Sequence, residues 1–175
     1  VKREPSDLGP VGECAAVEVV AAKDRRCSAP MELPERRMKA RRRILAAAME
    51  ARRQGAQWAL FSELAICGYP PEDLVLRDAF LAAHDRSLAS LAGNLPPDLP
   101  VLVGCLERNA RAAELGGRPL HNAAALCEDG IARVVARKSL LPTYDIFDEA
   151  RYFEAGARPE TNVVVIGGRR FGVTI

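Results

Sequence analysis

The chain has 175 residues, of which 49% are hydrophobic and 27% charged, which is enough for one domain with its own core. The formal net charge of +2 is close to balanced, so neither nucleic acid nor a membrane surface is indicated as a partner. No apolar run approaches the roughly 20 residues of a membrane span, and residues 1–5 lack the apolar core of a secretory signal. We therefore expect a cytoplasmic protein.

Residues 1–34 predict an atypical or poorly ordered N-terminal segment. Its apolar stretch, Val11–Ala22, is compatible with a strand or a helix, because periodicity cannot decide so short a run. From residue 35 onward the pattern predicts one domain, which begins with a helix over Glu35–Arg53 that Gly55 ends. The basic residues of this helix indicate a solvated face rather than a nucleic-acid site, because no aromatic residues interleave with them.

The remaining elements alternate between helices and strands. Trp58–Phe61 is a short apolar strand, Tyr69–Asp73 is a turn into a short helix, and Asp78–Ala92 is an amphipathic helix whose apolar stripe includes His84. Asp129-Gly130 predicts the turn of a hairpin. Further strands are expected at 101–105, 122–127, 131–136, 162–166 and 171–175, the last two joined through Gly167–Arg170. The fold class is therefore α/β, or layered α+β.

Five cysteines make an odd number and form no Cys-x-x-Cys pair. Neither a disulfide framework nor a metal site is predicted. Apolar neighbours suit a thiol that acts as a small hydrophobe, and we expect structural or incidental roles for all five: Cys14, Cys27, Cys67, Cys105 and Cys127.

The first segment with a chemical signature runs from Leu60 to Leu74 and contains Glu63 at the predicted end of a buried strand. A carboxylate in such a place costs free energy unless it is paired. It is compatible with a general base, but residue type alone favours a strand-end carboxylate that forms a salt bridge or faces solvent.

The second segment, Arg137–Phe153, places Lys138 directly after a predicted strand. A fixed positive charge at such a point can stabilise an oxyanion. Considered alone, Lys138 is better explained as a solvated lysine at the end of a strand.

Together these two segments resemble the glutaminase domain of the glutamine-dependent NAD synthetases, within the nitrilase or carbon–nitrogen hydrolase superfamily. That family carries sequence motifs close to F-P-E-L-x-x-x-G-Y-P-P-E-D-L and K-x-x-L-P-x-Y-x-x-F-D-E-x-R-Y-F, in the order found here. The resemblance covers roughly Pro34–Ile175. It implies a nitrilase-type α-β-β-α sandwich, incomplete at its C-terminus.

The resemblance also implies residue roles, because the family uses a Glu-Lys-Cys triad. Glu63 is the expected general base, and Lys138 is the expected stabiliser of the oxyanion. Tyr144 matches a position associated with glutamine binding, and Glu149 is an expected supporting carboxylate. Glutamine is the expected substrate, a homo-oligomer the expected assembly, and no cofactor or metal is expected for this part.

The sequence departs from the family pattern in three respects. In the family, the cysteine nucleophile comes directly after a strand that resembles Phe171–Ile175, and residues 1–175 do not include that position. We therefore expect no glutaminase turnover from residues 1–175 alone. We find no phosphate-binding loop, so ATP and Mg²⁺ are expected only in a synthetase domain that this sequence lacks. Ser62 stands where the family usually has proline before the glutamate.

Two alternatives stay open on the sequence alone. One is another carbon–nitrogen hydrolase that acts on a different amide or carbamoyl compound. The other is a non-catalytic remnant with a role in binding or assembly.

Overall fold

A computed structural model describes residues 18–19, 33–145, 147–156 and 162–175. Most of the expected N-terminal segment, including Val11–Ala22 apart from Glu18–Val19, lies outside the described residues, as do Cys14 and Cys27. Between residues 33 and 38 only the backbone is described. None of the described helices is both long and apolar enough to cross a lipid bilayer.

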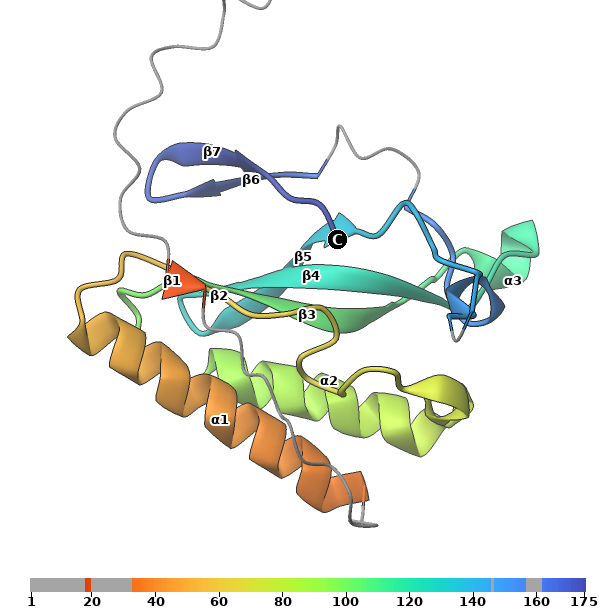
Figure 1. Cartoon of the computed structure of the whole chain (residues 1–175), viewed down its shortest axis with the longest axis horizontal. Helices are drawn as coiled ribbons and strands as arrows, with labels where there is room; N and C mark the ends of the chain where they lie inside the picture. The colour runs from red at the N-terminus through yellow and green to blue at the C-terminus, as the bar shows by residue number, and fades with distance from the viewer. Residues whose placement is uncertain (1–17, 20–32, 146, 157–161) are drawn as a thin grey trace, which may run out of the picture.

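The centre of the molecule is a five-stranded mixed sheet (Figure 1). The first three strands run parallel, and the last two pair antiparallel to their neighbours. In sheet order, the strands are β1 (Glu18–Val19), β2 (Ala59–Leu60), β3 (Val101–Arg108), β4 (Leu120–Glu128) and β5 (Ile131–Arg137).

Helices cover one face of this sheet and a hairpin covers the other. Helices α1 (Leu33–Arg53) and α2 (Asp78–Ala92) lie side by side on one face, and β6 (Val163–Ile166) and β7 (Arg169–Gly172) lie on the opposite face (Figure 1). The described residues thus form α, β and β layers in that order, which confirms the expected fold class.

The two covered faces explain the sequence patterns. Helix α1 buries Ile44, Ala48 and Ala51, at the three- and four-residue steps that place side chains on one face of a helix. Strand β4 is buried at nearly every position from Leu120 to Cys127, because its two faces meet separate layers. Near-continuous apolar runs are typical of strands covered on both sides.

Most of the predicted elements are confirmed, with small shifts at their ends. The short helix at Glu72–Leu76 is a 3₁₀ helix, and a four-residue helix, α3 (Ala112–Leu115), was not predicted. Strand β2 is shorter than expected, whereas β3 runs on to Arg108.

The predicted bounds of the last strand, 171–175, are wrong. Strand β7 begins at Arg169, and the turn before it is only Gly167-Gly168, both with positive φ. Such tight two-residue turns match the twist of a hairpin, so the two arginines pair with β6 instead of forming the loop. Residues 173–175 then continue beyond the strand.

Gly104 in β3 sets the distance between the sheet and the loop that follows β2. A Cβ atom at this position would lie 2.5 Å from the Ser62 carbonyl oxygen and 2.6 Å from Glu63 Cα, and it would also collide with the backbone nitrogen of Leu64. Only glycine therefore allows the backbone that carries Glu63 to rest on β3.

We expect Gly104→Ala to lower the free energy of unfolding by about 1–3 kcal/mol, the usual cost of overpacking a core, because the clash is with backbone that cannot rotate away. Urea unfolding measures this change. Gly172→Ala is the matched control, since a Cβ there meets nothing within 4 Å. Equal stability of the two variants would contradict the predicted clash.

Candidate active site

The loop after β2 places Glu63 over the middle of the sheet. The Phe61 N–H donates to the Leu102 carbonyl at 2.9 Å, and the Gly104 N–H donates to the Ser62 carbonyl at 3.2 Å. The chain then turns away at Leu64, which has a positive φ of 49°. Glu63 is therefore fixed at its backbone on both sides, although it lies beyond the end of the strand itself.

Strand β5 delivers Lys138 to the same place. Lys138 is 8% exposed, and its Nζ lies 2.6 Å from Oε1 of Glu63. It also contacts Glu149 at 3.0 Å. Three of the four residues singled out from the sequence therefore meet in one ion cluster, although 75 positions separate Glu63 from Lys138.

Glu149 is buried on the other side of Lys138. It lies in the 3₁₀ helix Glu149–Arg151 and is 5% exposed. Its Oε1 accepts a hydrogen bond from the Tyr69 hydroxyl at 3.0 Å, and its N–H donates to the Pro142 carbonyl at 3.1 Å. One ammonium group thus lies between two carboxylates, and burial makes each of these contacts costly to break.

The carboxylates keep Lys138 charged. Burial alone lowers the pKa of Lys138, but the hydrogen bonds to Glu63 and Glu149 outweigh it and hold the pKa above its ordinary value. Burial, followed by the hydrogen bond to Glu149, raises the pKa of Tyr69, so its hydroxyl remains a donor. The cluster therefore presents a permanent cation between two acceptors near neutral pH.

This cation predicts an alkaline loss of stability. Because the pKa of Lys138 is higher in the folded state, its contribution is complete below about pH 10.4, the unfolded value, and is lost as the pH rises through the folded value. We expect the free energy of unfolding to fall more steeply above that pH in the wild type than in Lys138→Met. Urea unfolding between pH 9 and 11.5 tests this, and parallel curves would contradict it.

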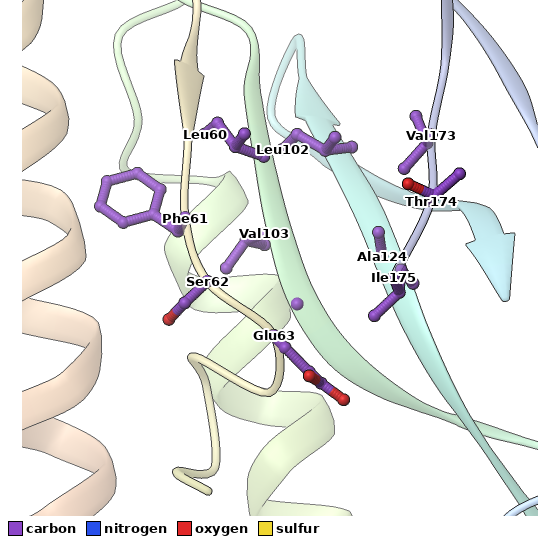
Figure 2. Close-up of a pocket in the computed structure, with 11 residues that line it drawn as sticks. Leu60, Phe61, Ser62, Glu63, Leu102, Val103, Ala124, Val173, Thr174 and Ile175 are labelled. Carbon is purple, nitrogen blue, oxygen red and sulfur yellow. The ribbon is translucent and has the colours of Figure 1, made fainter. Parts of the chain in front are cut away.

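A cavity of about 260 Å³ adjoins the carboxylate (Figure 2). Glu63 is the ionisable side chain of its lining, which otherwise comes mainly from apolar residues of β2, β3 and β4. Val173, Thr174 and Ile175 complete the lining. The segment after β7 therefore lies against the same cavity as Glu63.

Tyr144 lies outside the ion cluster. It is 69% exposed and packs edge-on against Phe147, with ring centroids 5.6 Å apart, and Phe147 in turn contacts Tyr69 at 6.2 Å. Tyr144 is therefore joined to the cluster through this run of aromatic rings. Its expected role in glutamine binding stays a prediction.

Two site residues were missed from the sequence. Asn122 in β4 donates through Nδ2 to Oε1 of Glu63, and Tyr69 donates to Glu149. A polar side chain directly before the apolar run 123–127 was a usable signal for Asn122, since buried amides normally have partners. Tyr69 lies in the same motif as Glu63, but no role was predicted for it.

Other residues of the two motif segments have a structural explanation. The Tyr152 hydroxyl donates to Asp73 at 2.7 Å, and Arg151 pairs with the same carboxylate at 3.3 Å. These contacts fasten the 3₁₀ helix that carries Glu149 to the one that follows Tyr69. The two segments are therefore held together outside the site as well as within it.

The described cysteines fit structural roles. Cys105 and Cys127 are buried in the core; burial raises the pKa of Cys127 to about 11 and that of Cys105 further. A thiol that stays protonated at neutral pH is a poor nucleophile. His84, expected on the apolar stripe of α2, is fully buried and accepts a hydrogen bond from the Leu106 N–H at 3.0 Å.

Comparison with solved structures identifies the class of fold. The chain superposes on the glutamine-dependent NAD⁺ synthetase of Acinetobacter baumannii with a TM-score of 0.67 and 30% identity, over 79% of this chain and 24% of that one. It also superposes on the NitN amidase of Nesterenkonia with a TM-score of 0.55 and 24% identity, over 78% of this chain and 49% of that one, a likeness of fold alone. The chain has the nitrilase-type fold of carbon–nitrogen hydrolases.

Sequence comparison is more specific, although no protein-family model matches the chain. It is 41% identical to the glutamine-dependent NAD(+) synthetase of Synechocystis over 133 residues, and 40% identical to that of Thermotoga maritima over 123 residues. These matches cover 76% and 70% of this chain. The chain is homologous to the glutamine-dependent NAD(+) synthetases, and it spans 24% and 20% of the length of these two relatives.

Proposed function

We propose that this chain is part of a glutaminase module that hydrolyses the side-chain amide of glutamine to glutamate and ammonia, for the amidation of deamido-NAD. The relatives named as glutamine-dependent NAD(+) synthetases support the substrate. The observation that carries the proposal is the Glu63–Lys138 contact of 2.6 Å, beside a cavity that also meets Ile175. A base, a fixed cation and an adjoining space are what acyl transfer from an amide requires.

In the proposed reaction, Glu63 accepts the proton of the cysteine thiol that the family pattern places directly after a strand like Phe171–Ile175. The thiolate adds to the amide carbon of glutamine, and the charge that develops on the amide oxygen is stabilised by Lys138. Collapse of this adduct breaks the C–N bond, and Glu63 returns its proton to the leaving ammonia. Water then adds to the thioester with Glu63 again as base, which releases glutamate and restores the thiol.

The other residues of the cluster support these two. Glu149 is the second carboxylate that contacts Lys138, which helps to keep the ammonium group in one position. Tyr144 is proposed to contact the substrate, because its ring is exposed at the end of the aromatic run. No metal or cofactor takes part in these steps.

The proposal also covers the amidation reaction, the oligomeric assembly and the cellular location. ATP and Mg²⁺ would serve the amidation in a synthetase domain, and no step at Glu63 or Lys138 passes through them. A homo-oligomer is proposed from the resemblance alone. A cytoplasmic location is supported by the free thiols of Cys105 and Cys127, because the cytoplasm keeps thiols reduced.

The test is an assay of the protein translated from its complete reading frame. We expect glutamate release from glutamine, and NAD formation when deamido-NAD and ATP are added. Hydrolysis of another amide or carbamoyl compound, with glutamine left intact, would instead assign the protein to a different carbon–nitrogen hydrolase activity. Binding of glutamine without turnover of any of these compounds would indicate a non-catalytic role.

A further inference from the structure

The side chain of Asn122 is energetically unfavourable at its buried position. It is fully buried in β4, where an amide costs free energy unless its hydrogen bonds are satisfied. Its Nδ2 has a partner in Glu63, but its Oδ1 is buried with no hydrogen bond. A leucine of similar size would avoid this cost, so core packing does not explain the asparagine.

The two donors that reach Glu63 converge on one oxygen. Asn122 Nδ2 and Lys138 Nζ both bond to Oε1 of Glu63. Within the described part of the chain, Oε2 receives no hydrogen bond from either donor. The two carboxylate oxygens are therefore in different environments, one held by two donors and the other available.

The backbone reinforces this arrangement. The Lys138 N–H donates to the Asn122 carbonyl at 2.8 Å, so the residue that binds Glu63 through its side chain also binds Lys138 through its main chain. Gly104, on the neighbouring strand β3, fixes Glu63 at its Cα. Backbone position and carboxylate orientation are thus set by two adjacent strands.

We propose that Asn122 is a positioning residue for the glutaminase reaction: it holds Oε1 of Glu63 against Lys138 and so presents Oε2 to the thiol as the proton-accepting oxygen. The inference rests on the proposed function for its chemistry, and on geometry alone for the positioning. A base aimed in this way reacts faster because little reorientation is needed in the transition state.

The first arm of the test uses residues 1–175 and needs no activity. NMR spectroscopy of protein labelled at lysine and glutamate measures the nuclear Overhauser contact between the side chains of Lys138 and Glu63. We expect the contact to weaken in Asn122→Leu and in Asn122→Asp, which keeps the size of the residue but repels Glu63. It should persist in Asn162→Leu, a matched loss of a 9% exposed amide that bonds to the Arg137 backbone instead.

The second arm uses the protein from the complete reading frame. We expect Asn122→Leu to lower kcat for glutamate release about 10- to 100-fold, the range set by loss of a hydrogen bond to a charged group. KM for glutamine should change by less than about twofold, because Asn122 acts through Glu63 and not on the substrate. Placed in the Glu63→Gln background, the same change should have no further effect.

The outcomes separate the two proposals. An unchanged contact in both Asn122 variants would overturn the positioning role, and so would a kcat loss that multiplies in the Glu63→Gln background. If the wild-type protein releases no glutamate, the proposed function falls, while the NMR contact still decides whether Asn122 positions Glu63. If one of the two Asn122 variants does not fold, the other is used, because leucine removes the hydrogen bond to Glu63 whereas aspartate repels Glu63.

Discussion

Lys138→Met is expected to lower the free energy of unfolding by about 3–5 kcal/mol and to lower kcat for glutamate release by about 10²–10³-fold. Removal of one partner of a buried ion cluster costs this much because the other charges stay buried without compensation. Here the loss leaves Glu63 and Glu149 on either side of the vacated position, at 5% exposure for Glu149. The transition state loses its fixed cation at the same time.

Urea unfolding at pH 7 and an assay of glutamate release measure the two effects of Lys138→Met separately. Glu149→Gln in the same background should restore part of the stability, because it removes one buried charge, but none of the activity. Arg137→Met is the matched control: it breaks a half-exposed ion pair with Glu107, which is worth no more than about 1 kcal/mol. A stability loss no larger than that of the control would show that the cluster is solvated.

Glu63→Gln is expected to reduce kcat for glutamate release by about 10²–10⁴-fold, the range for removal of a general base. The folded structure should change little, because the glutamine side chain has the same shape and its amide oxygen can still accept from Asn122 and Lys138. Activity and stability should therefore separate in this variant, in contrast to Lys138→Met.

Glu107→Gln controls for the loss of one negative charge near the site. Glu107 lies on β3 and pairs with Arg137 outside the ion cluster, so its replacement should leave kcat within about twofold of the wild type. Equal activity of Glu63→Gln and the wild type would remove Glu63 from the role of base. Equal losses in both variants would point to a general charge effect.

The elements predicted most accurately are those determined by local contacts. Helix α2 has the expected bounds, and the β4–β5 hairpin forms around Asp129-Gly130, because helical periodicity and turn residues act over a few positions. The bounds of β7 were misplaced, since arginines at 169 and 170 look like loop residues. Their pairing with β6 depends on which two residues make the turn.

The same distinction applies to the site, because local sequence patterns do not show which distant residues come together. Glu63 and Lys138 are ambiguous as single residues, and only the resemblance to a family predicted that strands so far apart in the chain bring them together. Asn122 could not be assigned because an apolar run does not reveal which carboxylate an embedded amide meets. That pairing is a consequence of the β3–β4–β5 order and register.

The central proposal is that Glu63 and Lys138 act as one catalytic unit. The rate of glutamate release by the Glu63→Gln/Lys138→Met double variant tests this most directly. Residues of one catalytic unit have strongly non-additive effects, because either loss alone removes most of what the pair supplies. We predict that the double variant is no more than about threefold slower than the slower single variant. Losses that multiply across the two changes would contradict a shared site.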